Sequence, residues 1–440
     1  MTCIGHAIQI TDGIMLGPNF WPIVWVTLAI DAAALAIFYQ PGRNIPCWPF
    51  LLVVVICLLI NFIQLESKAP GIFLRASQFE HLQHFLPGVG VAAVLCGIIV
   101  MSDGIVRRCA FAGVLMTIAY LGHWTICNSP NPSIDVYVFQ ADSSSALKRG
   151  HNPYDMTFPD IYGPPDKVYG PGVVKNGRLQ FGYPYFPETL LTIMPARLMN
   201  LDVRYSHLAA LILTAVLIVA IQPELIGYCS ALLLLTTPRI FFLIEQSFVE
   251  PFVILAFTAT VFCSVRLPRA LPIAMGSFLA SKQYVPMVAI LVFLWPRPWR
   301  ENLRLLIGAM IVAALVTLPL ALWNFRAFWQ STITLQFHQP FRWDSISYLA
   351  LIGEAHIPKP AQVAIPFGIF FAAIHLVLWL RKSLTFSAAI AFCFLLFFAF
   401  NKQAFGNYYL FVMSALACAI VEPHRNPGYP SGASNWRAVP

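Results

Sequence analysis

Long apolar segments, each close to the length that crosses a lipid bilayer, alternate with short polar segments along the 440-residue chain. A helix needs roughly 20 apolar residues to cross the hydrocarbon core. The pattern predicts spans at 20–39, 48–65, 86–101, 109–127, 205–221, 223–241, 248–265, 303–325, 361–380, 385–400 and 407–421. Two shorter pieces, 270–281 and 285–296, predict a helical hairpin and bring the total to about 13 spans. We therefore expect an all-α polytopic membrane protein.

One further apolar segment, FPETLLTIMPARLMN (186–200), is too short to cross the membrane. Pro195 interrupts it, and proline removes a helical hydrogen bond. The segment is therefore expected to form a helix that lies in the membrane interface.

Composition supports the membrane assignment, since 58% of the residues are hydrophobic and only 10% are charged. A soluble domain needs far more charge to cover its surface. The net charge of +8 comes from basic residues scattered over short loops, which is typical of cytoplasmic loops and gives no reason to expect a nucleic-acid partner. The ten cysteines lie mainly inside apolar runs without metal-ligand spacing, so they are read as small buried residues.

The basic residues also predict the orientation of the chain, because they collect on the cytoplasmic side of membrane proteins. They cluster at Arg43, Arg107 and Arg108, Arg266 and Arg269, 297–304, Arg381 and Lys382, and Arg425. With the N-terminus outside, and with 186–200 not crossing, all of these clusters are cytoplasmic. The loop 128–185 then faces away from the cytoplasm, as do 326–348 and 401–409. We expect a multi-pass protein of a bacterial inner or plasma membrane with its functional site facing outward.

The outer loop 128–185 begins with an unusual group of charged residues, of which Asp135 is nearest to the membrane. Its carboxylate could accept a proton from a hydroxyl that attacks an activated carbon. It could equally cap a helix that runs from Val136 onward. Further along, Gly150 and the Asn152–Pro153 pair predict a helix stop and a turn beneath Asp135.

These residues resemble the GT-C superfamily of membrane glycosyltransferases, and within it glycosyltransferase family 87. The resemblance rests on Asp135, Leu147, Gly150, Asn152, Pro153, Tyr154, Tyr183, Pro184, Pro187 and Pro195. It covers about 60 residues densely, and the remainder matches as a hydropathy profile. The family's usual YPP run is YPYFP in this chain.

The resemblance implies a GT-C-like bundle that moves a sugar, with mannose expected, from a polyprenyl-phosphate donor to a lipid or glycan acceptor. Asp135 would be the general base of an inverting transfer, with Asp142 as the second choice. A phosphate leaving group is already stable, so one carboxylate suffices. No cofactor is expected. A metal requirement stays open, although no DxD motif accompanies Asp135.

Three basic residues are candidates for binding the donor phosphate. Lys282 is expected at the outer tip of the short hairpin, where it could bind phosphate or extend to the lipid headgroups. His338 and Arg342 stand among aromatic residues of the later outer loop, which suits either a lipid-phosphate head or an ordinary interfacial aromatic belt.

The remaining site candidates are aromatic, amide and acidic. Asn152, Tyr154, Tyr183 and Tyr408 are the expected substrate-binding side chains. Glu245 and Glu250 are further acidic candidates that could bind a metal or an acceptor sugar, or could simply cap helices.

The chain divides by this interpretation into an N-terminal three-helix extension (1–108), a GT-C-like catalytic module (109–421) and a cytoplasmic tail (422–440). Membrane lipids are expected partners. A transporter or flippase of a lipid-linked substrate is the alternative, and it predicts internal repeats and charges at mid-membrane depth, of which the chain shows little beyond Asp31. A non-catalytic membrane scaffold is the third possibility.

Overall fold

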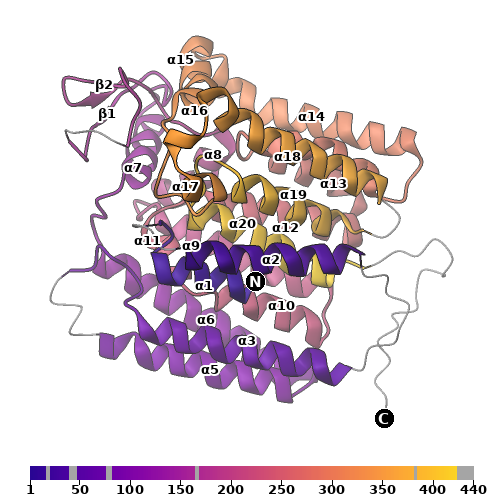
Figure 1. Ribbon diagram of the computed structural model, residues 1–440. Helices are drawn as coiled ribbons and strands as arrows, with labels where there is room; N and C mark the ends of the chain where they lie inside the picture. The colour runs from indigo at the N-terminus through magenta and orange to yellow at the C-terminus, as the bar shows by residue number, and fades with distance from the viewer. Residues whose placement is uncertain (16–19, 39–46, 76–81, 164–167, 381–383, 424–440) are drawn as a thin grey trace.

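The structure is a computed structural model that describes residues 1–15, 20–38, 47–75, 82–163, 168–380 and 384–423. Its helices lie side by side as a bundle, with α7 and a small sheet at one end (Figure 1, left). The predicted basic positions Arg43, Arg381, Lys382 and Arg425, and residues 424–440 of the predicted tail, lie outside the described residues.

The described residues are mostly helical. In chain order the helices are α1 (Thr2–Thr11), α2 (Trp21–Phe38), α3 (Cys47–Ser67), α5 (Leu86–Met101), α6 (Gly104–Asn128), α7 (Asp135–Lys148), α8 (Pro187–Leu198), α9 (Arg204–Ile221), α10 (Leu225–Leu235), α11 (Ile240–Glu245), α12 (Glu250–Arg266), α13 (Leu271–Leu279), α14 (Trp299–Ala321), α15 (Phe325–Trp329), α16 (Leu335–His338), α17 (Tyr348–Ile352), α18 (Lys359–Trp379), α19 (Phe386–Ala399) and α20 (Gly406–Val421). A 3₁₀ helix covers Val285–Leu294, and a π-helical turn, Gln330–Thr334, joins α15 to α16.

Five of these helices are long and apolar enough to cross a membrane: α3, α6, α9, α14 and α18. Shorter apolar helices, among them α2, α5, α19 and α20, pack beside them. The all-α membrane class predicted from hydropathy is therefore confirmed, while the number of spans stays a prediction.

The run 223–241, predicted as one span, is divided into α10 and α11. Pro238 disfavours helical backbone at the residue before it. Arg239 then adopts a left-handed conformation (φ 66°), which is uncommon for a residue other than glycine. The break turns the chain before α11.

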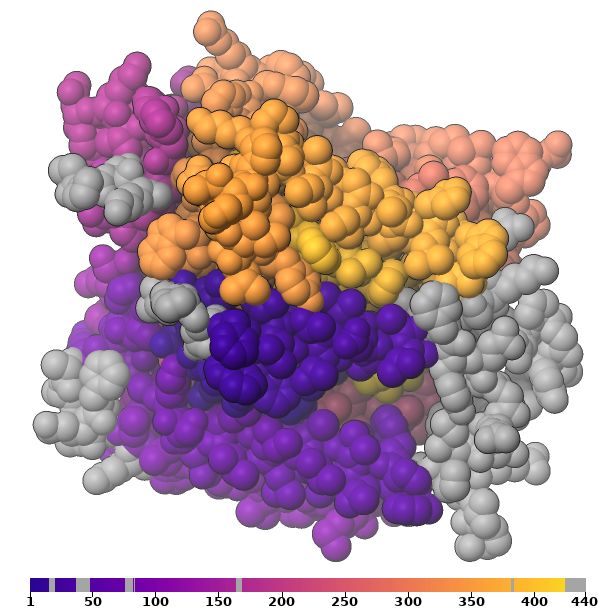
Figure 2. Space-filling model, viewed as in Figure 1, coloured from indigo at the N-terminus to yellow at the C-terminus, as the bar shows by residue number. Residues whose placement is uncertain are grey.

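The N-terminal helices pack directly against the C-terminal ones. α1, which the hydropathy pattern did not predict, contacts α20, and the N–H of Gly406 donates to the carbonyl of Gly13 at 2.9 Å. α2 contacts α19, and its Thr27 shares a 2.5 Å hydrogen bond with Tyr348. Figure 2 shows the indigo surface of α2 lying directly below the orange and yellow C-terminal segments. The main apolar core cluster includes residues from Ile4 near the N-terminus to Val421 at the end of α20.

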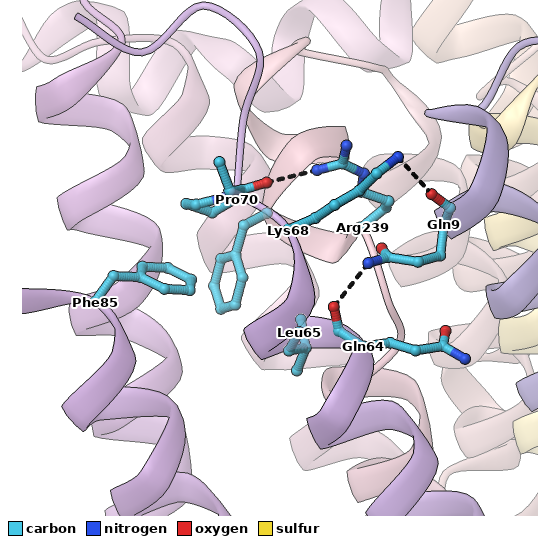
Figure 3. Close-up of a pocket in the computed structure, with 9 residues that line it drawn as sticks. Gln9, Gln64, Leu65, Lys68, Pro70, Phe85 and Arg239 are labelled. Atoms are coloured by element: carbon cyan, nitrogen blue, oxygen red, sulfur yellow. Dashed lines mark hydrogen bonds between the residues drawn. The ribbon is translucent and has the colours of Figure 1, made fainter. Parts of the chain in front are cut away.

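A polar cluster anchors α1 to the break before α11 (Figure 3). Arg239 is buried, donates to the carbonyl of Ala69 and forms an ion pair with Asp12. Lys68 bonds the same Asp12 at 2.9 Å and also donates to the carbonyl of Gln9. The N-terminal helices are thus held by charged contacts as well as by apolar packing.

Within the segment 128–185, which the charge pattern predicts to face outward, a small sheet packs on α7 through a small apolar cluster. Its strands β1 (Phe158–Pro159), β2 (Val174–Lys175) and β3 (Arg178–Leu179) form an antiparallel sheet in the order β1-β3-β2. Leu179 stands opposite both Phe158 and Val174. The rings of Phe158 and Phe139 of α7 pack with centroids 4.7 Å apart, which seats the sheet on that helix.

The segments predicted to share one side of the membrane do meet at one end of the bundle. The side chain of Gln140 in α7 donates to the carbonyl of Ser247, between α11 and α12. The amide of Gln283 donates to the carbonyl of Pro184. The N–H of Arg342 donates to the carbonyl of Lys402 at 3.1 Å. The loops 128–185, 326–348 and 401–409 therefore build one surface.

Candidate functional site

Asp135 is the first residue of α7, and its carboxylate accepts three hydrogen bonds. The preceding Ile134 is extended, so the helix begins at Asp135, and Oδ1 accepts from the N–H of Val136 at 2.8 Å. The hydroxyl of Tyr169 donates to Oδ2 at 2.8 Å, and that of Tyr162 to Oδ1 at 3.3 Å. Asp135 thus serves the local helix start and also lies against two phenols of the outer loop.

The surroundings of Asp135 favour a carboxyl that titrates above its ordinary range. Burial raises the pKa of Asp135, while the hydrogen bonds from Tyr169, Val136 and Tyr162 and the charge on Arg342 act in the opposite direction. Desolvation disfavours the charged form, and donors to a carboxylate favour it. A carboxyl whose pKa is raised is a stronger base when it ionises.

Lys282 lies buried just beyond α13, in a cage of aromatic rings. Its ammonium forms an ion pair with Glu250 at the start of α12. The same nitrogen lies 4.6 Å from the ring centroid of Tyr408, 5.3 Å from that of Tyr284 and 5.7 Å from that of Tyr185. Aromatic faces attract a cation, so the cage stabilises the ammonium in a site with little water.

Glu250 is completely buried, and one of its carboxylate oxygens, Oε2, has no hydrogen-bond partner among the described residues. A buried carboxylate that leaves acceptor capacity unused is costly unless a further donor arrives. Oε2 of Glu250 can therefore accept a hydrogen bond from another polar group.

Arg342 is the second cation of the site, and it is held rigidly. Its Nε and Nη2 donate to the two carboxylate oxygens of Asp344 at 2.8 and 2.7 Å. The guanidinium lies 4.8 Å from the ring centroid of Phe405. Burial lowers the pKa of Arg342. The carboxylate of Asp344 and the charge on Asp135 raise this pKa by more, so its net shift is upward. Asp135 and Arg342 are thus close enough to interact electrostatically.

Tyr185 connects Asp135 with the Lys282–Glu250 pair. Burial raises the pKa of the Tyr185 phenol, and so do the negative charges of Asp135 and Glu250. Because its ring also faces Lys282, Tyr185 lies between the two groups of charges. Two of the three candidate phosphate-binding residues thus lie around the candidate base: Arg342 interacts with the charge on Asp135, and Lys282, with Tyr408 beside it, lies against Tyr185.

Three predicted substrate-binding residues support the chain segment that carries Tyr185. Tyr154 and Tyr183 are fully buried, and the hydroxyl of Tyr154 donates to the carbonyl of Tyr185 at 2.9 Å. Asn152 accepts from the N–H of Tyr154 at 2.9 Å and so closes the turn. The backbone of Tyr154 lies so close to Gly182 that a Cβ there would collide with it. In this structure these residues position Tyr185.

Other predicted site residues lie apart from the Lys282 cage. The imidazole of His338 is exposed, and its Nδ1 lies 2.8 Å from the carbonyl of Thr334 in the preceding turn. Asp142 is exposed two turns along α7, about 10.5 Å from Asp135 along the helix axis.

Glu245 has a different set of partners. Its buried carboxylate accepts from the N–H groups of Ile72 and Phe73 at 2.7 and 3.0 Å and from the side chain of Gln246. A Cβ on Gly71 would collide with this carboxylate. Glu245 therefore secures the chain that follows α3.

The sequence reasoning missed Tyr162, Tyr169, Tyr185 and Tyr284 as site residues. Tyr162 and Tyr169 precede glycine and Tyr185 follows proline, a composition that indicates only turns, while Tyr284 stands between Gln283 and Val285 in a turn after α13. Their one common signal is that tyrosine recurs in otherwise irregular segments on the predicted outer side. Within the described residues, no three His, Cys, Asp or Glu side chains are grouped so as to hold a metal ion.

The fold and the site together define an all-α membrane protein with several apolar helices and a polar, tyrosine-rich site at one end of its bundle. No family model, no curated protein and no solved structure matches the chain. The assignment to a particular activity therefore rests on the chemistry of the site.

Proposed function

We propose that the protein is a membrane glycosyltransferase of the GT-C type, which moves a sugar, with mannose expected, from a polyprenyl-phosphate donor to a lipid or glycan acceptor. The observation that carries the proposal is that Tyr185 lies against Lys282 and within the electrostatic influence of Asp135, while Asp135 also interacts with the charge on Arg342. A carboxylate next to cations, within reach of lipid, suits a base and a phosphate leaving group.

In the proposed reaction the acceptor hydroxyl attacks the anomeric carbon of the donor sugar. The bond from that carbon to the phosphate oxygen breaks, and its electron pair leaves with the phosphate. Asp135 takes the proton of the attacking hydroxyl. The attack comes from the face opposite the phosphate, so the configuration inverts. The acceptor hydroxyl would replace Tyr162 or Tyr169 as the donor to the Asp135 carboxylate.

Lys282 and Arg342 would stabilise the negative charge on the departing phosphate. Each is already paired with a carboxylate, Glu250 and Asp344 respectively. A donor phosphodiester carries one negative charge, and charge-assisted hydrogen bonds to fixed cations strengthen as that charge grows on the leaving group. The tyrosine cage would also cover one face of the sugar.

The finer membrane topology belongs to the same proposal. We infer about 13 spans, with α8 lying in the interface and with the site facing outward. The bacterial inner or plasma membrane is the expected location.

Purified protein in liposomes tests the proposal. Polyprenyl-phosphate carrying radiolabelled mannose is the donor, bacterial membrane lipids are the acceptor pool, and a radiolabelled nucleotide-mannose is the control donor. We expect label to move from the polyprenyl-phosphate donor and not from the nucleotide donor. Movement from the nucleotide donor alone, or from neither, would contradict the proposal.

A further inference from the structure

A hollow opens between α8, α12 and α13. Its volume is about 190 Å³, far above the roughly 10–15 Å³ that a single water needs by the same kind of measure. Phe252, Leu255, Ala256 and Ala259 of α12 and Ile273 and Ala274 of α13 form its apolar wall. The hollow exists because small alanine side chains occupy the positions where the three helices face one another.

The hollow borders an exposed apolar surface. Ile273 on its wall is 62% exposed, on an apolar helix that packs between α12 and α14. In a membrane such a surface contacts lipid tails. An apolar chain can therefore enter the hollow sideways from the lipid phase.

One end of the hollow is polar and is formed by Glu188 in the first turn of α8. Its Oε1 accepts from the hydroxyl of Ser277 at 2.9 Å and is 3.4 Å from that of Thr192. Its Oε2 is shielded from solvent and has no hydrogen-bond partner among the described residues. Burial raises the pKa of Glu188 to about 7, against the hydrogen bonds from Ser277 and Thr192. Oε2 of Glu188 is thus an acceptor without a partner at the end of an apolar hollow.

The Glu188 carboxyl at this end discriminates between a phosphate and a hydroxyl as the head group of a bound lipid. A phosphate placed beside the Glu188 carboxylate is repelled whenever that carboxylate is ionised, because like charges close together repel strongly where little water separates them. Among the described residues, those that line the hollow include no cation to offset this. A hydroxyl, in contrast, can donate to an ionised carboxylate or accept from a protonated one.

We propose that the hollow between α8, α12 and α13 binds the apolar chain of an uncharged lipid whose hydroxyl group bonds Oε2 of Glu188. The site of Lys282 and Arg342 suits the opposite kind of head, an anionic one. Glu188 stands three residues after Tyr185, so the two places are neighbours on the same chain segment. If the proposed function holds, on which this last step rests, the hollow holds the lipid acceptor by a hydroxyl other than the one that attacks, while the cationic site holds the donor.

Direct binding tests this proposal without any transfer reaction. The full-length protein in detergent is titrated with radiolabelled geranylgeraniol and, separately, with radiolabelled geranylgeranyl phosphate. The two probes have the same chain and differ only in the head. Ala259→Phe fills the hollow, and Ala112→Phe makes the same change on the exposed face of α6 as a control. Glu188→Gln removes the charge, with exposed Glu224→Gln as its control.

We expect Ala259→Phe to weaken geranylgeraniol binding at least about tenfold, a loss of about 1.4 kcal/mol, while Ala112→Phe leaves it unchanged. We expect the preference of this hollow for the alcohol over the phosphate to fall in Glu188→Gln and not in Glu224→Gln. Unchanged alcohol binding in Ala259→Phe would overturn the proposal. So would a loss of phosphate binding alone in that variant, which would make the hollow part of the donor site. If the wild-type protein binds the alcohol but transfers no sugar from the polyprenyl-phosphate donor, the proposed function is refuted and the hollow remains as described.

Discussion

The hydroxyl of Tyr169 donates to Oδ2 of Asp135 at 2.8 Å, while the hydroxyl of Tyr162 reaches the other oxygen at 3.3 Å. The stronger of the two contacts thus comes from Tyr169, a residue of the outer loop that lies 34 positions after the carboxylate. The environment of the proposed base is therefore built by the fold of the loop and not by α7 alone.

This contact predicts a pH dependence. Hydrogen bonds to the carboxylate lower the pKa of Asp135, so Tyr169→Phe should raise it. A general base works only when ionised, so activity falls as the pH drops through this pKa. We expect the acid limb of kcat/KM to move to higher pH in Tyr169→Phe.

Tyr162→Phe is the matched comparison, because it removes the longer and weaker of the two bonds. Its acid limb should move in the same direction by a smaller amount. Equal acid limbs in wild type and both variants would show that Asp135 does not set the pH dependence.

The Lys282–Glu250 pair predicts a stability pattern that separates structure from function. Removing one partner of a buried ion pair leaves the other charge uncompensated, at a cost of about 3–5 kcal/mol. Lys282→Met should therefore lower the thermal unfolding temperature strongly. The double variant Lys282→Met with Glu250→Gln should regain most of the stability and stay inactive, because no cation remains there for the donor phosphate.

Thermal unfolding and the rate of sugar transfer, measured on Lys282→Met, on Glu250→Gln and on the double variant, check this prediction. Recovery of both stability and transfer in the double variant would make the pair purely structural.

Glu188, outside the membrane-spanning segments, predicts a second pH effect, on stability. Its pKa is about 7 in the folded protein against an ordinary value of 4.5. The fold thus favours the neutral carboxyl, and this advantage is complete below pH 4.5 and is lost as the pH rises through about 7. Glutamine is neutral throughout. Relative to wild type, Glu188→Gln should gain stability as the pH rises across this window, by up to about 3 kcal/mol.

Unfolding temperatures of wild type and Glu188→Gln at several pH values between 4.5 and 8 check this effect. The exposed Glu224→Gln variant is the control. A stability difference that does not change with pH would show that the Glu188 carboxyl is not stabilised in its neutral form.

Hydropathy predicted the helices well because each apolar run must find lipid or a packed neighbour. Hydropathy did not predict the places where the backbone conformation breaks a helix inside an apolar run. Pro238 and the left-handed Arg239 divide the run 223–241, since a buried arginine with partners in α1 and in the chain after α3 fixes a turn there. The hydropathy pattern did not predict α1, because this helix is short and packs against other helices rather than forming a long apolar run.

The structure brings some of the predicted site residues near one another. Asp135 and Arg342 interact by charge, and Lys282 and Tyr408 lie in one aromatic cage, in segments that the charge pattern predicted to share one side of the membrane. Asn152, Tyr154 and Tyr183 stand in the family-like segment, but sequence alone does not tell a side chain that contacts substrate from one that supports its neighbour. That distinction depends on burial, which follows from long-range packing.

The most direct test of the account compares Asp135→Asn with Asp142→Asn in the transfer assay with a polyprenyl-phosphate-mannose donor. Both changes remove one carboxylate charge from α7, but only Asp135 lies against Tyr169 and interacts with Arg342. The account predicts that Asp135→Asn lowers kcat by about 10²–10⁴-fold and that Asp142→Asn leaves it within about twofold of wild type. Full activity in Asp135→Asn would contradict it.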